Sequence, residues 1–356
     1  MKRLFKILMW IFIVIFALVL IVALLNVIPT APKSKNKSKF WTSGETLNIP
    51  HGGAKELYPE NTKYSFDMTA EYGVFEIDLS MTKDGVLISH HDTNLASSLN
   101  IKDTDPNNPE NDIINLTFQE VKNKISIEYN YAYAREFTSS SQEKPFIFDE
   151  LKKAEYLPVT LEYMFQTYPK GLYILEIKDT TENSGEETFI KASNNLKELI
   201  LDYEMSENVV VASFDDDVMA EFRSLDGTIP TALAWNETLM FIVQSALFVD
   251  FFYFPDAAVA SIPMRQTIEK DSSTGKLLGK VPGFIRSRIA EDKGDYYLVN
   301  LGTKRIIDDL HRHGIAVVFW TVDDVDDMKL LIDLGADGII TDRPDLLENV
   351  LTEGIQ

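Results

Sequence analysis

The chain has 356 residues, a length that suits one large α/β domain with an appendage. Apolar residues make up 45% of it, enough for a sizeable core, and the absence of cysteine excludes disulfides and thiolate catalysis. Of the 34 basic and 55 acidic residues, seven basic and no acidic ones lie in residues 1–40, so the rest of the chain carries a net charge of −28. This negative charge disfavours nucleic acid as a partner and tolerates or attracts divalent cations.

An unbroken apolar run, residues 7–25, follows the basic residues Lys2, Arg3 and Lys6. A helix of these 19 residues is about 28 Å long, close to the hydrocarbon thickness of a bilayer. The run predicts an uncleaved single-pass membrane anchor over residues 1–28. A cleaved signal peptide, whose apolar region is usually shorter, is the alternative.

The basic N-terminus favours a cytoplasmic start and an extracytoplasmic catalytic domain. The four lysines of the basic linker, residues 29–46, argue for the opposite orientation. These lysines either lie on the anionic headgroups of the bilayer or belong to a flexible spacer.

From residue 47 onward, short apolar segments alternate with amphipathic helical stretches, the pattern of βα units around a parallel sheet. The candidate strands are 47–50, 74–79, 172–177, 209–212, 230–235, 251–254, 316–320 and 338–341. They predict an α/β fold, a (β/α)8 TIM barrel over residues 47–350. Residues 93–158 hold a polar stretch with two prolines and then a serine-rich stretch, so they predict an insertion over the barrel mouth between strands two and three.

Acidic side chains gather at the carboxyl ends of the second and third strands, where such barrels carry their active sites. Glu76 and Asp78 lie two residues apart and so share one face of a strand, and Glu176 comes from the next strand. Three carboxylates that converge without a compensating partner repel one another. A hard cation such as Ca²⁺ or Mg²⁺ removes that cost, so the pattern predicts a site for one divalent cation.

Histidines accompany these carboxylates. His51 follows the first strand, and a second segment begins at a predicted hairpin turn and ends in His90, His91 and Asp92. An aspartate next to a histidine can orient the imidazole ring of the histidine or stabilise its protonated, charged form. Two histidines near three carboxylates favour catalysis over two purely structural histidines.

The ordered motifs of residues 47–350 resemble those of the glycerophosphodiester phosphodiesterase family. They are His51-Gly52-Gly53-Ala54 with Pro59-Glu60-Asn61-Thr62, Phe75-Glu76-Ile77-Asp78 with Thr82-Lys83-Asp84-Gly85 and His91-Asp92, Leu175-Glu176-Ile177-Lys178, Ser213-Phe214, Trp320-Thr321-Val322, and the run from Gly335 to Pro344. Each motif is modest alone, but the ordered set is specific.

The resemblance implies a role for each matching residue. It makes Glu76, Asp78 and Glu176 the ligands of the cation, His51 and His91 the acid–base pair, and Lys178, Glu60 and Trp320 the residues that contact the substrate. The family's spacing selects His91 rather than its neighbour His90. The implied reaction is metal-dependent hydrolysis of a glycerophosphodiester to an alcohol and glycerol 3-phosphate, with water or the substrate's own glycerol hydroxyl as the nucleophile.

One position departs from the family pattern, since Gly52 stands where the family usually has arginine. The loss of a bidentate donor to phosphate implies weaker phosphate binding, a different phosphate partner or a retired site. The full set of the other groups argues against retirement.

Three other functions remain open. They are lysophospholipase D-like hydrolysis of lysophospholipids to lysophosphatidic acid, a non-catalytic module that binds glycerophosphodiesters, and a cyclising lyase similar to sphingomyelinase D. The Glu176-x-Lys178 pattern and the intact Pro-Glu-Asn-Thr motif favour the hydrolase family over the lyase.

Residues 239–264 are unusually apolar for a barrel segment. They predict either plain core or an apolar lip at the mouth that takes an acyl chain or touches the bilayer, because apolar positions fill more than one helical face. The run is similar to the lysophospholipase D-like branch of the family. Farther on, His311 and His313 lie in a polar helical stretch and are expected at the surface.

Overall fold

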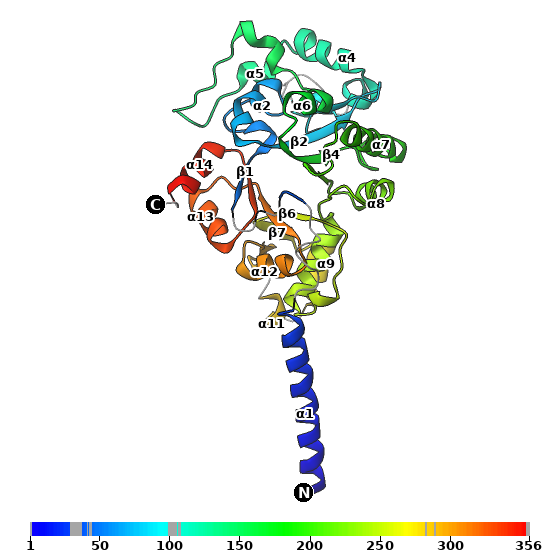
Figure 1. The fold of residues 1–356 in the computed structure, drawn as a ribbon, viewed down its shortest axis with the longest axis vertical. Coiled ribbons are helices and arrows are strands. Elements are labelled where there is room, and N and C mark those ends of the chain that lie inside the picture. The colour runs from blue at the N-terminus through cyan, green and yellow to red at the C-terminus, as the bar shows by residue number, and fades with distance from the viewer. Residues whose placement is uncertain are drawn as a thin grey trace.

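The structure, a computed structural model, describes residues 2–28, 38–40, 42, 45–98, 105, 108–281, 283–287 and 290–353. In these residues, helices surround a ring of parallel strands (Figure 1). The strands of the ring are β1 (Leu47–Pro50), β2 (Val74–Met81), β4 (Leu172–Ile177), β5 (Val209–Ala212), β6 (Val259–Pro263), β10 (Ala316–Trp320) and β11 (Gly338–Thr341).

The strands of the ring lie in two sheets, in the orders β1-β11-β10-β6 and β3-β2-β4-β5, where β3 (Leu87–Ser89) is an antiparallel edge strand outside the ring. Parallel bridges from Thr231 to Val211 and from Ala232 to Val259 join β5 to β6, so residues 231–232 take the place of a strand. At the other seam β1 lies beside β2. The expected (β/α)8 barrel is thereby confirmed.

Small and β-branched side chains fill the barrel interior, as close packing inside a closed ring of parallel strands requires. The buried cluster contains Ile49, Val74, Ile174, Val210, Ala232, Val259, Val318 and Ile340. Phe40 packs against the same cluster and is 1% exposed, so the segment expected to be a linker reaches the barrel by its last residues. Lys33, Lys35 and Lys37 lie outside the described residues, and Lys39 Nζ donates to Asn208 Oδ1 at 2.6 Å.

Two strand predictions need correction. The fifth strand, expected over 230–235, is reduced to the two bridging residues. The sixth strand is not 251–254 but β6, and the aromatic run instead begins with a 3₁₀ turn, Asp250–Phe252. Asp250 is fully buried there against Arg312 and His313, and these long-range contacts override the strand propensity of the aromatic residues.

The outer layer pairs a helix with most strands. These helices are α2 (Lys63–Thr69), α6 (Leu161–Thr167), α7 (Glu186–Asp202), α8 (Asp216–Leu225), α9 (Trp235–Ala246), α12 (Lys304–Arg312), α13 (Val325–Leu334) and α14 (Pro344–Glu353). In α7 the buried residues Phe189, Ala192, Leu196 and Ile200 recur at helical spacing, which packs one face on the sheet and leaves the other in solvent.

The expected insertion follows β3 (Leu87–Ser89), which pairs antiparallel with β2. It contains α3 (Leu95–Ser98), α4 (Phe118–Asn123) and α5 (Ala132–Glu136). Aromatic contacts fasten it to the barrel, because Tyr64 of the first βα unit lies 5.6 Å from Phe146 and 5.3 Å from Tyr156 between ring centroids.

A second excursion, between β6 and α12, was not predicted. It contains β7 (Arg265–Glu269), α10 (Ser273–Lys280), α11 (Gly283–Arg286), β8 (Ala290–Asp292) and β9 (Tyr296–Asn300). The three strands form a small antiparallel sheet in the order β7-β9-β8, which packs beside α9.

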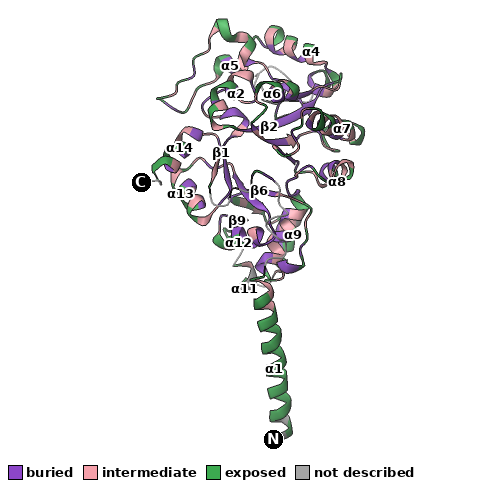
Figure 2. Cartoon of the chain, in the orientation of Figure 1, coloured by how far each residue is buried: buried purple, intermediate pink, exposed green. Residues whose placement is uncertain are grey.

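Helix α1 (Lys2–Leu25) projects from the barrel domain near α9, α11 and α12 (Figure 1), and the side chains described along it are largely exposed (Figure 2). Its segment Phe5–Leu25 has a mean hydropathy of 3.4 and is long enough to cross a membrane. Where the helix ends, Asn26 Nδ2 donates to the carbonyl of Phe248 at 2.9 Å, and Arg312 Nη1 lies 3.5 Å from the carbonyl of Leu25.

The expectation that His311 and His313 are surface residues is wrong for His313. His313 is 7% exposed, and its Nε2 lies 3.1 Å from Asp250 Oδ2. His311 is half-buried, with its Nε2 2.7 Å from Asp337 Oδ2. Both side chains connect the end of α12 to segments that are distant in the sequence. The polar composition of the helix does not reveal these contacts.

Candidate active site

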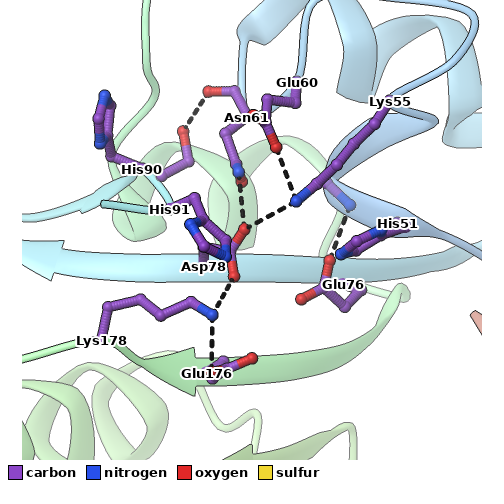
Figure 3. Close-up of polar contacts among 12 residues, drawn as sticks. His51, Lys55, Glu60, Asn61, Glu76, Asp78, His90, His91, Glu176 and Lys178 are labelled. Atoms are coloured by element: carbon purple, nitrogen blue, oxygen red, sulfur yellow. Dashed lines mark hydrogen bonds and ion pairs between the residues drawn. The ribbon is translucent and has the colours of Figure 1, made fainter. Parts of the chain in front are cut away.

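The three expected carboxylates meet at the mouth of the barrel (Figure 3). Glu76 and Asp78 are 4% and 1% exposed on β2, and register places Glu176 of β4 opposite Asp78. One carboxylate oxygen from each of the three residues lies within 4.8 Å of the other two, a geometry that could hold a metal ion. The backbone N–H of Gly52 donates to Glu76 Oε2 at 2.7 Å and fixes that side chain against β1.

These carboxylates are not without compensating charges, contrary to expectation. Lys178 Nζ lies 2.7 Å from Glu176 Oε1 and 3.0 Å from Asp78 Oδ1. Lys55 Nζ lies 3.7 Å from Asp78 Oδ2. Two ammonium groups therefore share the negative charge of the cluster.

The pKa values of two of these carboxyl groups shift in opposite directions. Burial alone would raise the pKa of Asp78, but Lys178 and Lys55 outweigh it and hold that pKa below its usual range. Burial, reinforced by the charge of Asp78, raises the pKa of Glu76 to about 7. Asp78 is thus the permanent anion at the centre of the site.

The donor set fits a hard divalent cation. All three side chains offer oxygen, the ligand atom that Ca²⁺ and Mg²⁺ prefer. Asp78 Oδ1 is buried at the centre of the cluster and lies 3.0 Å from Lys178 Nζ, which also donates a hydrogen bond to Glu176 Oε1.

His51 stands on the turn after β1, with its Nδ1 2.7 Å from Asp342 Oδ1. Burial lowers the pKa of His51, but the hydrogen bond to Asp342 and the charge of Glu76 outweigh it, and the pKa is raised. A carboxylate at Nδ1 leaves Nε2 for proton transfer. Asp342 was part of a motif in the sequence but was not assigned a role.

The turn around His51 requires glycine. Gly53 has a φ of 84°, and a Cβ there would lie 2.4 Å from Ser65 Oγ. Gly52 has a φ of 51°, and a Cβ there would lie 2.8 Å from Lys55 Cε. The space beside Gly52, where the family pattern has an arginine, is therefore taken by the side chain of Lys55.

His91 follows β3, with its Nδ1 2.8 Å from Asp92 Oδ1. The hydrogen bond to Asp92, aided by the charge of Asp78, raises the pKa of His91 against partial burial. His90 turns away (Figure 3), is 4% exposed, and its Nδ1 lies 2.6 Å from the carbonyl of Asp92. The geometry thus turns His91 toward the carboxylates and His90 away from them.

A cavity of about 170 Å³ connects most of these groups. Its walls include His51, Glu76, His91, Glu176, Lys178, Phe214 and Trp320. Phe214 and Trp320 form an aromatic pair with ring centroids 5.3 Å apart. Glu60 is placed differently, because its Oε2 lies 2.7 Å from Lys55 Nζ and the residue lines a smaller, neighbouring cavity.

A second acidic group lies nearby and consists of Glu56, Asp323 and Asp342. Asp323 Oδ1 already accepts hydrogen bonds from Thr341 Oγ1 and from the backbone N–H of Asp342. Since Asp342 holds His51, this group supports the histidine.

Comparison with known proteins agrees with this geometry. The model of the glycerophosphoryl diester phosphodiesterase family matches residues 51–346. A glycerophosphodiester phosphodiesterase of Bacillus subtilis is 25% identical, with 93% of this chain and 95% of that protein covered. A lysophospholipase D of Homo sapiens is 23% identical, with 86% and 84% covered.

Solved structures share the fold. The phosphodiesterase of Oleispira antarctica, determined with the product sn-glycerol-3-phosphate, superposes with a TM-score of 0.54 at 16% identity, covering 88% of this chain and 99% of that one. The family match begins directly after β1 and includes every residue of the site described above. The chain therefore belongs to the glycerophosphoryl diester phosphodiesterase family, and the expected enzyme class, a phosphoric diester hydrolase, is confirmed.

Proposed function

We propose that this protein hydrolyses glycerophosphodiesters to an alcohol and glycerol 3-phosphate by means of His51 and His91. The observation that carries the proposal is their arrangement. Each histidine is held at Nδ1 by a carboxylate, both line one cavity, and in Figure 3 they lie on either side of Glu76 and Asp78. The relatives and the product-bound neighbour support the substrate class.

The two histidines take different parts. His51 acts as the base: Asp342 fixes the tautomer that leaves Nε2 free, and the proton of the nucleophile passes to that atom. His91 acts as the acid: Asp92 raises its pKa, so that a proton is available for the leaving alcohol. Lys178 holds Glu176 and Asp78 in place and presents its ammonium to the cavity wall, where a phosphate oxygen can bind. Trp320 bounds the space left for the glycerol group.

We further propose that Glu76, Asp78 and Glu176 hold one divalent cation, Ca²⁺ or Mg²⁺. When bound, such an ion neutralises charge on a non-bridging phosphate oxygen. Lys55 stabilises the ligand set by its ion pair with Asp78, and the ion pair of Lys55 with Glu60 positions the Lys55 ammonium. Glu60 is thus assigned to support of the site rather than to direct contact with substrate.

The test is turnover of glycerophosphocholine by the purified full chain, followed by phosphorus NMR. Glycerol 3-phosphate as the first product supports attack by water, whereas a cyclic phosphate indicates attack by the glycerol hydroxyl. Tight binding of glycerophosphocholine without either product refutes the proposal and indicates a non-catalytic binding module. His51→Ala and His91→Ala chains, checked for native circular dichroism, should each lose turnover.

Lysophospholipids are a second candidate substrate. One of the relatives is a lysophospholipase D, and an apolar cavity of about 40 Å³ lies between α9 and the small antiparallel sheet. Its walls include Leu239, Ile242, Val243, Ile268 and Leu278. A volume of this size holds about one methylene or water-sized group, so an acyl chain requires the walls to part. The ratio of kcat/KM on lysophosphatidylcholine to kcat/KM on glycerophosphocholine tests this candidate.

We also propose that Phe5–Leu25 anchors the chain in a membrane with the barrel on the extracytoplasmic side. The segment is long, apolar and exposed, and basic residues precede it. Retention of the helix in the mature protein, determined by intact mass, separates an anchor from a cleaved signal. Protease digestion of sealed vesicles then tests the orientation.

A further inference from the structure

The loop that follows α9 presents large apolar side chains to solvent. Among them Leu247 is 44%, Phe248 42%, Phe252 69% and Phe254 75% exposed. Single exposed apolar residues are common, but such a concentration within eight residues marks a contact surface. These four residues are called the apolar patch below.

The outward orientation of the patch is built into the fold. Asp250, Phe251 and Tyr253 are buried, so the chain alternates between inward and outward side chains from 251 to 254. Asp250 is held by Arg312, and His313 Nε2 lies 3.1 Å from it. The exposure of Phe252 and Phe254 is therefore not the consequence of a loosely packed loop.

The patch lies where the apolar helix ends. The carbonyl of Phe248 accepts a hydrogen bond from Asn26 Nδ2 at 2.9 Å, one residue beyond the end of α1. Arg312 contacts the last residue of α1 and also fixes Asp250 of the patch loop. Figure 1 shows α1 leaving the domain beside α9 and α12.

Cationic groups border the same region. The Arg305 guanidinium lies 3.7 Å from the ring centroid of Phe248, and Lys304 precedes it on α12. Aromatic side chains flanked by basic ones suit the boundary between acyl chains and headgroups. A second copy of this chain would not account for the contact between the patch and the end of an apolar helix.

We propose that the apolar patch inserts into the interface of the same bilayer that α1 crosses. This inference rests on the membrane anchor proposed above and extends it from one helix to a surface of the barrel. Helices of such barrels run antiparallel to the strands, so the loop from the end of α9 to the start of β6, which holds the patch, lies at the end of the barrel opposite the mouth. The patch is thus not the lip of the active site that residues 239–264 suggested.

The absence of cysteine from the chain allows a direct test. Phe252→Cys and Phe254→Cys full-length chains are labelled with an environment-sensitive fluorophore and placed in lipid nanodiscs with one chain each. Leu151→Cys is the matched control, because Leu151 is an apolar residue of the insertion that is 95% exposed. Ala17→Cys, in the middle of α1, reports on the anchor itself.

The labels at 252 and 254 should show blue-shifted emission, loss of quenching by iodide, and quenching by lipids with a nitroxide near the headgroup. The label at 151 should show none of these. If the label at 17 is quenched by deep nitroxides while 252 and 254 behave like 151, the anchor stands and this inference is overturned. If the label at 17 is also not quenched, the anchor itself fails. Shielding that occurs in crowded liposomes but not in nanodiscs with one chain assigns the patch to a second copy and also overturns the inference.

Discussion

His51 and Asp342 lie 291 residues apart in the chain and are joined by a contact of 2.7 Å between Nδ1 and Oδ1. The contact follows from barrel closure, because β1 pairs with β11 in a register that sets Pro50 opposite Thr341. The residue that follows β1 is His51, and the residue that follows β11 is Asp342. The first and last strands of the barrel together therefore build the base of the proposed reaction.

Asp342→Asn should lower kcat about 10²-fold with little change in KM, since the amide can no longer select the tautomer of His51. Asp342 raises the pKa of His51, so its loss should lower that pKa. A base with a lower pKa is deprotonated at lower pH, and the acidic limb of the kcat/KM profile should move to lower pH. Glu56→Gln, in the same acidic group but exposed, is the control. An unchanged acidic limb in Asp342→Asn would show that His51 is not the base.

His91→Ala should abolish hydrolysis of glycerophosphocholine but retain part of the activity on a nitrophenyl phosphodiester. Nitrophenolate leaves without a proton, whereas an alkoxide needs the acid. The kcat ratio between the two substrates measures the effect. His90→Ala is the matched control, because its side chain turns away from the cavity. If His90→Ala loses all activity and His91→Ala remains normal, the two roles are reversed.

Gly52→Arg should weaken substrate binding rather than restore it. A Cβ at this position meets Lys55 Cε at 2.8 Å, and the φ of 51° strains any residue other than glycine. In Gly52→Arg/Lys55→Ala the new guanidinium has room, so kcat/KM should exceed that of either single variant. Such non-additivity, measured in a double-mutant cycle, indicates that the two cations compete for one place. Additive losses would contradict that reading.

Excess chelator should abolish turnover, and added Ca²⁺ or Mg²⁺ should restore it. Glu176→Gln should lose activity and metal binding, measured by calorimetry, while thermal stability changes little, since Glu176 is partly exposed. Asp78→Ala is expected to behave differently, because it leaves Lys55 and Lys178 without their shared partner and should cost about 3–5 kcal/mol of stability. Full activity in chelator would exclude the metal.

The barrel could be predicted because its strands are short, β-branched and separated by helical periodicity. The site carboxylates could be placed because parallel strands end at one mouth, so Glu76, Asp78 and Glu176 converge wherever the register allows it. Both inferences use spacings of a few residues, which the sequence displays directly.

The remaining features depend on contacts between distant segments. The side chain of Lys55 lies in the site because Gly52, which has no side chain, leaves room for it. Only the three-dimensional structure shows this close approach. The aromatic residues after Asp250 have strand propensity, yet Arg312 and His313 capture that aspartate and prevent a strand. Among the described residues, the strands of the excursion from β7 to β9 pair only with one another, so no periodicity of the barrel predicts them.

Phe40 and Asn26 together limit how the barrel can move relative to α1. Phe40 is buried against the barrel interior, and Asn26 is bonded to the loop after α9, so the chain is fastened to the domain on both sides of residues 29–37. Lengthening residues 29–37 with flexible residues would therefore leave the position of the catalytic cavity relative to α1 unchanged.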